Sequence, residues 1–159
     1  MTQRLDYLKQ RGTDWLLGGD FQQLIPLTEQ LYLELSQRKQ QGIVPKVLIA
    51  ERESVEFLAG FIAASAANCP VFLSNPSWVK QEWQQVFKMV QPDLVLGYGN
   101  WDLEIKNYYP NSQPFVDDNW VMIPTGGSSG EIRFAIHTWE TLSASVAGFQ
   151  QSLARKAGA

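Results

Sequence analysis

Three short apolar runs separated by two helical patterns constrain this chain more than any other feature. Residues 47–50 have the continuous apolar composition of a buried parallel strand, and residues 71–73 and 93–97 are predicted as the next two strands. Between these runs, apolar side chains recur at helical spacing over residues 55–66 and 79–90. The order strand, helix, strand, helix, strand predicts an α/β fold in which a parallel sheet is joined by right-handed crossovers.

Particular residues mark the ends of the predicted helices. An earlier helix is expected to begin at Ile25 and Pro26 and to stop at Gly42. Asn68 is expected to take the left-handed turn that ends the 55–66 helix. Ser77 is expected to cap the 79–90 helix, whose inward apolar stripe begins at Val79. Residues 1–21 contain apolar anchors but no pattern that assigns an element.

A loop of small residues lies between two segments that favour strands: an apolar run at 120–123 and an alternating segment at 133–137. The loop consists of Thr125, Gly126, Gly127, Ser128, Ser129 and Gly130. It has three glycines and three hydroxyls, and no side chain large enough to keep a ligand away from the backbone. Successive backbone N–H groups can converge on an anion and the hydroxyls add donors, so the loop suits a polyphosphate.

Spacing excludes two other phosphate-binding loops. A Walker loop needs a lysine directly after its last glycine, whereas Gly130 is followed by Glu131. A dinucleotide-binding loop needs G-x-G-x-x-G opening a helix, whereas Gly126 and Gly127 are adjacent and the loop leads into a strand. A hairpin connection in which glycine and serine only supply flexibility is the alternative explanation, since turns use the same residues.

The loop resembles the phosphate-binding loop of the adenylate-forming superfamily, which includes acyl-CoA synthetases, luciferases and peptide-synthetase adenylation domains. All six loop residues, from Thr125 to Gly130, fall within the superfamily pattern [T/S]-[S/G]-G-[S/T]-[S/T]-G. After Gly130 the chain departs from the superfamily pattern, because Ile132 occupies the usual position of proline and Arg133 that of lysine. Within this superfamily, the sequence of residues 120–130 and 134–142 most resembles that of the cyanobacterial type of 2-succinylbenzoate–CoA ligase, which serves phylloquinone and menaquinone synthesis.

This resemblance implies an activity, its co-substrates and its residues. It implies that ATP, with Mg²⁺, activates a carboxylic acid as an acyl-adenylate, and that coenzyme A then displaces AMP. Residues 125–130 and Arg133 are expected to bind the nucleotide phosphates. The superfamily's downstream motifs are not found in residues 1–159, so the resemblance implies one incomplete N-terminal portion of an AMP-binding domain, inactive by itself. Its partners are expected to be small-molecule substrates and the missing C-terminal part.

The segment after the loop contains two further candidates for binding the acyl substrate, His137 and Thr138. His137 is the single histidine, and a lone histidine at a strand end is more often structural. Thr138 is placed as the N-cap of a helix running to about Arg155. The apolar stripe of this helix is Leu142, Val146, Phe149 and Leu153. No metal-binding residues are assigned within the chain, because adjacent carboxylates such as Asp117 and Asp118 diverge and are common in turns.

Composition excludes several classes of function. A net charge of −3 gives no electrostatic basis for binding nucleic acid or an anionic membrane. The longest apolar stretch, residues 57–67, is too short to span a bilayer, and the single cysteine, Cys69, suits a reducing cytoplasm. Two non-enzymatic hypotheses stand beside the enzyme: a nucleotide- or partner-binding α/β module, and an incomplete domain that self-associates through a sheet edge and aromatic surface.

Overall fold

A computed structural model of the chain describes residues 3–11, 16–17, 21–97, 120–126 and 130–157. Its centre is a five-stranded sheet in the order β3-β1-β2-β4-β5. The strands are β1 Val47–Ile49, β2 Val71–Leu73, β3 Leu94–Leu96, β4 Val121–Gly126 and β5 Ile132–His137. Strand β1 pairs in parallel with both β2 and β3, and β4 pairs in parallel with β2. The predicted parallel α/β fold is therefore confirmed, and the predicted hairpin is the antiparallel pair β4–β5.

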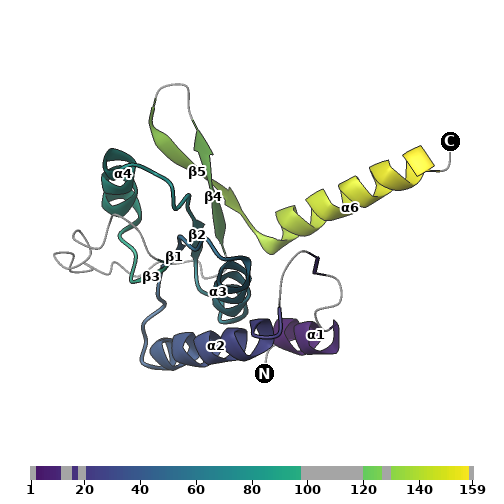
Figure 1. Cartoon of the computed structure of the whole chain (residues 1–159), viewed down its shortest axis with the longest axis horizontal. Helices are drawn as coiled ribbons and strands as arrows, with labels where there is room; N and C mark the ends of the chain where they lie inside the picture. The colour runs from purple at the N-terminus through teal and green to yellow at the C-terminus, as the bar shows by residue number, and fades with distance from the viewer. Residues whose placement is uncertain (1–2, 12–15, 18–20, 98–119, 127–129, 158–159) are drawn as a thin grey trace.

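Helices cover both faces of the sheet, as Figure 1 shows. The helices in the described ranges are α1 Gln3–Arg11, α2 Leu24–Gln40, α3 Ser54–Ala66, α4 Lys80–Val90 and α6 Trp139–Ala157. Because side chains alternate along a strand, Val47 and Ile49 pack among α2 and α3 residues while Leu48 packs among α4 residues. Full burial of an aliphatic side chain such as Leu48 contributes about 1.5–3 kcal/mol relative to exposure.

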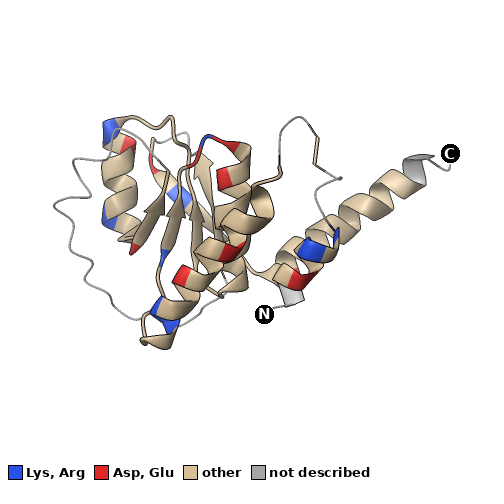
Figure 2. Cartoon of the chain, turned by 60° about the horizontal axis from the view of Figure 1, so that its bottom comes forward, with Lys and Arg blue, Asp and Glu red and all other residues tan. Residues whose placement is uncertain are grey.

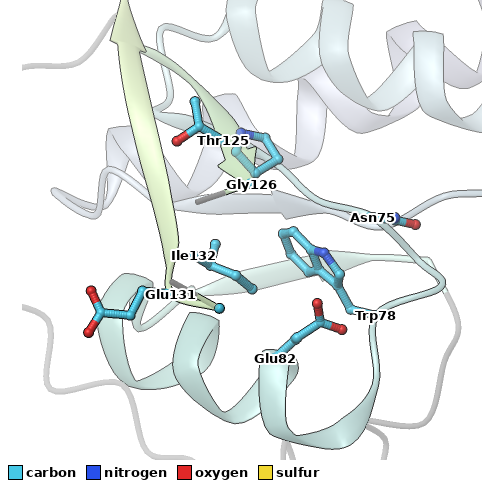
Figure 3. Close-up of a pocket in the computed structure, with 9 residues that line it drawn as sticks. Asn75, Trp78, Glu82, Thr125, Gly126, Glu131 and Ile132 are labelled. Atoms are coloured by element: carbon cyan, nitrogen blue, oxygen red, sulfur yellow. The ribbon is translucent and has the colours of Figure 1, made fainter. Parts of the chain in front are cut away.

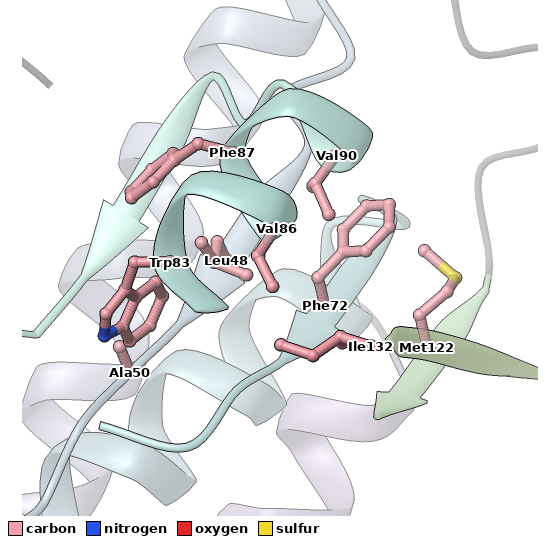
Figure 4. Close-up of a cluster of buried hydrophobic side chains, with 9 residues drawn as sticks. All are labelled: Leu48, Ala50, Phe72, Trp83, Val86, Phe87, Val90, Met122 and Ile132. Atoms are coloured by element: carbon pink, nitrogen blue, oxygen red, sulfur yellow. The ribbon is translucent and has the colours of Figure 1, made fainter. Parts of the chain in front are cut away.

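The α4 side of the sheet forms an aromatic core that also anchors the hairpin (Figure 4). Trp83, Val86 and Phe87 from α4 are buried against Phe72 of β2. Ile132, the first residue of β5, is buried in the same cluster. The hydrophobic interactions of α4 therefore fix where the loop end of the hairpin lies.

Several predicted helix ends are confirmed and one is wrong. Asn68 has φ 54° and Gly42 has φ 83°, so both take the expected left-handed turns. Ser77 does not cap α4, which begins three residues later. Instead, the backbone N–H of Val79 donates to Oε2 of Glu82 at 2.8 Å. Val79 itself is 62% exposed, and Trp78 packs against the core in its place.

The two ends of the chain differ from the sequence-based expectations in other ways. Helix α1 was not predicted, although Leu5 and Leu8 are buried one helical turn apart. Thr138 does cap α6, because its Oγ1 accepts the N–H of Thr141 at 3.3 Å. Helix α6 extends away from the sheet (Figure 1), and every described side chain from residue 143 onward is exposed. None of the helices in the described ranges is long and apolar enough to cross a membrane.

Candidate functional site

A pocket of about 330 Å³ opens where the loop end of the hairpin meets the start of α4 (Figure 3). Its lining residues come from the turn after β2, from α4 and from both hairpin strands. They are Asn75, Trp78, Glu82, Pro124, Thr125, Gly126, Gly130, Glu131 and Ile132. In Figure 3, Trp78 and Ile132 face each other across the pocket. The pocket therefore has an apolar side chain on each of two facing sides, and both ends of the loop also line it.

Three interactions hold the hairpin in this position. The backbone N–H of Ile132 donates to Oε1 of Gln85 on α4 at 3.3 Å. Phe134 of β5 meets Phe72 edge to face, with ring centroids 5.6 Å apart. Across the hairpin, Oγ1 of Thr125 donates to the carbonyl oxygen of Arg133 at 3.3 Å. The loop therefore begins and ends on a fixed scaffold, which lowers the cost of ordering it around a ligand.

Thr125, Gly126 and Gly130, from the predicted phosphate-binding set, line the pocket together. Gly127, Ser128 and Ser129 lie outside the described residues. A Cβ added at Gly126 would meet no atom of the described residues within 4 Å, and the same holds at Gly130. Among the described residues there is therefore open space beside Gly126, in which a ligand can approach the backbone. Gly130 also has φ 73°, a conformation that favours glycine.

Charge in and around the pocket is mainly negative among the described residues. Glu82 and Glu131 line it, and in Figure 3 the Glu131 carboxylate points away from Trp78. Nη2 of Arg133 lies 3.3 Å from Oε2 of Glu131, and both side chains are largely exposed. Arg133 is not among the pocket-lining residues that the structure describes. Its charge is thus at the edge of the site and paired, rather than directed at the loop.

The pocket offers oxygen donors that suit Mg²⁺ only as part of a metal–phosphate complex. Within the described ranges, no group of three or more His, Cys, Asp or Glu side chains could hold a metal ion. Mg²⁺ is commonly bound by one or two carboxylates together with substrate phosphates and water. Glu82 and Glu131 are the carboxylates that line the pocket, so they are the residues that would contact Mg²⁺ if it arrived with a polyphosphate.

His137 and Thr138 lie at the opposite end of the hairpin from the loop. His137 pairs with Val121, whereas Ile132 pairs with Gly126 beside the pocket. Five residues of extended strand separate these pairs, a distance of roughly 17 Å. The Thr138 hydroxyl is engaged in capping α6. The described structure therefore does not bring the two candidate acyl-binding residues together with the loop.

The sequence analysis missed the contribution of the turn before α4. Asn75, Trp78 and Glu82 line the pocket, and none was assigned a role. The position of Trp78 in the sequence could have predicted this contribution. It lies outside the inward stripe of α4 and follows the turn after a predicted parallel strand. The carboxyl ends of parallel strands are where α/β proteins place ligand-binding residues.

The charged side chains elsewhere in the described ranges do not gather into a second site of a single sign. Lys, Arg, Asp and Glu are spread over several elements in the view of Figure 2. Burial raises the pKa of the Glu51 carboxyl, and the neighbouring carboxylates of Glu56 and Glu53 raise it further. Glu51 lies two residues after the end of β1 and does not line the pocket.

Comparison with known proteins places the fold. No protein-family model matches the chain, and no curated protein sequence matches it. Its mixed α/β structure matches the fold of the N-terminal domains of adenylate-forming enzymes. It superposes on apo MatB from Rhodopseudomonas palustris with a TM-score of 0.61 and 14% identity, covering 91% of this chain and 36% of MatB.

Two further solved structures were determined with adenylate-type ligands. The Klebsiella oxytoca NpsA N-terminal subdomain, in complex with 3-hydroxyanthranilyl-AMSN, gives a TM-score of 0.54 and 13% identity over 85% of this chain and 39% of that one. McyG A-PCP, complexed with phenylalanyl-adenylate, gives a TM-score of 0.53 and 17% identity over 87% of this chain and 33% of that one. At 13–17% sequence identity, the similarity to these structures shows a shared fold and nothing more. The chain spans only 33–39% of these three structures.

Proposed function

We propose that this chain is the N-terminal portion of an ATP-dependent acid–CoA ligase, and that its hairpin loop holds the β- and γ-phosphates of ATP. The observation that carries this proposal is the position of the loop ends. Thr125, Gly126 and Gly130 line a pocket beside α4, in a fold shared with enzymes solved in complex with adenylate-type ligands. The described structure also leaves open space at Gly126, where a ligand can approach the backbone.

The task assigned to the loop is electrostatic. The substrate carboxylate attacks the α-phosphorus of ATP, the bond to the bridging oxygen breaks, and negative charge builds on the departing pyrophosphate. Backbone N–H groups of residues 126–130 and the hydroxyls of Ser128 and Ser129 would donate to that charge. Preorganised donors of this kind are each worth about 2.7–4 kcal/mol in the transition state. Mg²⁺ bound to the phosphates supplies further positive charge, and Arg133 contributes from the edge of the site.

The wider enzyme would complete the reaction. The proposed acid is 2-succinylbenzoate, on the resemblance of residues 120–130 and 134–142, and coenzyme A is the proposed acceptor. His137 and Thr138 remain proposals for contacts to the acyl group. They would act there only if the acyl substrate extended along the hairpin away from the loop, because the strand separates them from it.

Two measurements on the purified chain test this function. Titration with Mg²⁺–ATP should show binding, because the loop and its pocket are within the chain. Incubation with ATP and 2-succinylbenzoate should yield no acyl-adenylate, because the chain lacks the groups that orient the acid, and such proximity effects supply about 7–11 kcal/mol of a barrier. Binding without turnover, together with downstream coding sequence that continues into the missing motifs, supports the ligase. Failure to bind any polyphosphate contradicts it and favours a partner-binding module.

A further inference from the structure

The connections that leave β1 and β2 diverge at the carboxyl end of the sheet. The two strands are adjacent and parallel. Helix α3, which follows β1, packs with Val47 and Ile49, whereas α4, which follows β2, packs on the face that holds Leu48. Such a divergence is the position at which open α/β sheets place their ligands. A side chain that spans it can therefore link the chain after β1 to the candidate site.

Arg52 spans this divergence from the connection after β1. Its Nη2 donates to the carbonyl oxygen of Pro76 at 3.0 Å, and its Nη1 donates to Oγ of Ser77 at 3.4 Å. Both acceptors belong to the turn between β2 and α4, in which Asn75 and Trp78 line the pocket. A guanidinium presents its N–H donors in a rigid planar fork, so one arginine can hold two acceptors at a fixed separation.

The remainder of this turn is held at its two ends. At its start, the backbone N–H and the Oγ of Ser74 both donate to the carbonyl oxygen of Ile49, at 3.0 and 2.7 Å. At its end, Trp78 packs against the aromatic core. Between these ends, within the described ranges, the hydrogen bonds from Arg52 are the ones that join the turn to another part of the chain. Arg52 therefore holds the middle of the turn.

Loss of these hydrogen bonds should affect ligand binding more than folding. Arg52 and Ser77 are both exposed, and exposed interactions of charged side chains contribute little to overall stability, because water competes for the same groups. A pocket wall that is already ordered, in contrast, loses less conformational entropy when a ligand binds. The affinity for a ligand and the free energy of unfolding should therefore respond differently to removal of the guanidinium.

We infer that Arg52 is a positioning residue for the pocket: it fixes the turn that carries Asn75 and Trp78, and thereby raises the affinity for polyphosphate. The inference rests on the proposed function for the identity of the ligand. Arg52 is not among the pocket-lining residues that the structure describes. It therefore acts through the turn and not by touching the ligand.

Isothermal titration with Mg²⁺–ATP, beside thermal denaturation, tests this split between affinity and stability. Arg52→Ala should bind about threefold to tenfold more weakly than wild type, with a nearly unchanged unfolding midpoint. Arg38→Ala is the matched control. Arg38 is also an exposed arginine, its Nη2 lies 2.9 Å from Oε1 of Glu34 on α2, and neither residue lines the pocket. This control removes the same charge and should leave the affinity unchanged. Equal affinity of folded Arg52→Ala and wild type overturns the inference.

A salt series separates positioning of the turn from direct attraction of the anion by the Arg52 charge. If the charge alone were responsible, the difference in affinity between wild type and Arg52→Ala would vanish at high salt, where the Debye length is about 3 Å at 1 M. Positioning predicts that the ratio of the two dissociation constants persists across the series. A ratio that falls to one at high salt overturns the inference.

Fluorine NMR of protein labelled with fluorotryptophan tests the position of the turn without any ligand. The Trp78 resonance is assigned by its loss in Trp78→Phe. Arg52→Ala should shift or broaden this resonance and leave that of Trp139, at the far end of the hairpin, unchanged, and Arg38→Ala should leave both unchanged. A Trp78 resonance that is the same in Arg52→Ala and wild type overturns the inference. A shifted resonance in a chain that binds no polyphosphate contradicts the proposed function and still supports the role of Arg52 in holding the turn.

Discussion

The carboxylate of Glu82 accepts the backbone N–H of Val79 at 2.8 Å, and the same side chain lines the pocket beneath the hairpin loop. Glu82 therefore closes the first turn of α4 and contributes charge to the candidate site. Glu82→Ala should lower the free energy of unfolding by about 0.5–1 kcal/mol, since the N–H of Val79 loses its acceptor. Glu82→Gln, which keeps an oxygen in place, should cost less. Thermal or urea denaturation measures both.

Ser77, which the sequence predicted as the N-cap of α4, provides a control for this prediction. Among the described residues, its hydroxyl accepts from Nη1 of Arg52 at 3.4 Å and makes no bond to the first turn of α4. Ser77→Ala should therefore be close to neutral. If Ser77→Ala were more destabilising than Glu82→Ala, the helix would begin where the sequence predicted and the observed capping would be wrong.

Removing the Glu131 charge should strengthen the binding of metal-free pyrophosphate. Glu131 repels an anion in the pocket and is paired with Arg133, so Glu131→Gln removes one negative charge and releases one positive charge. Because both groups are largely exposed, the gain should shrink as salt shortens the Debye length below about 10 Å. Glu140→Gln, on α6, is the matched control. Equal affinity for wild type and Glu131→Gln at low salt would place the anion elsewhere.

Gly97 should tolerate alanine less well than Gly42. Both have positive φ, 116° at Gly97 and 83° at Gly42, so alanine is strained at either position. A Cβ at Gly97 would also lie 2.5 Å from the carbonyl oxygen of Ala50, whereas one at Gly42 meets nothing within 4 Å. We expect Gly42→Ala to cost about 1 kcal/mol and Gly97→Ala at least about 2–3 kcal/mol. Equal losses in denaturant titrations would show that the approach of Gly97 to β1 is not maintained in solution.

Glu51 should make the protein less stable as the pH rises. Burial, then Glu56 and Glu53, raise its pKa in the folded state above the ordinary value of 4.5. The protonated form is therefore favoured by folding, and the unfolded chain ionises first, so stability falls as the pH rises above 4.5 until the folded group has also ionised. Glu51→Gln should raise the melting temperature at pH 7 and have little effect below pH 4.5. A shift that is the same at both pH values would contradict this assignment.

Much of the sheet was predictable because local patterns and long-range packing agree there. Residues 71–73 were predicted as a strand and form β2 with the same bounds. The strand is apolar, its neighbours are turns, and the flanking helices carry apolar stripes, so each level of the sequence favours the same structure. The hairpin strands and the Thr138 cap were predictable for the same reason.

The residues that were mispredicted depend on tertiary contacts that have no local signature. Serine is a good cap in isolation, but Trp78 packs against the core and makes a T-shaped contact with Trp83. That contact places the start of α4 after Val79. The pocket was only partly predictable, because the loop residues have a recognisable pattern whereas Glu82 becomes part of the site through the meeting of α4 and the hairpin. Spacing in α6 predicted its apolar stripe but not its exposure.

The most direct test of the account is the affinity of the chain for Mg²⁺–ATP when Gly126 is replaced. Gly126→Val adds a side chain where no described atom lies within 4 Å and where φ is not positive, so the fold should persist. Gly148→Val makes the same change on α6, also in open space and away from the pocket. Isothermal titration should show binding by wild type and Gly148→Val and an affinity about tenfold or more weaker for Gly126→Val, a loss of about 1.4 kcal/mol. An unchanged affinity in folded Gly126→Val would mean that polyphosphate does not approach the loop backbone, and the segment would be only a hairpin connection.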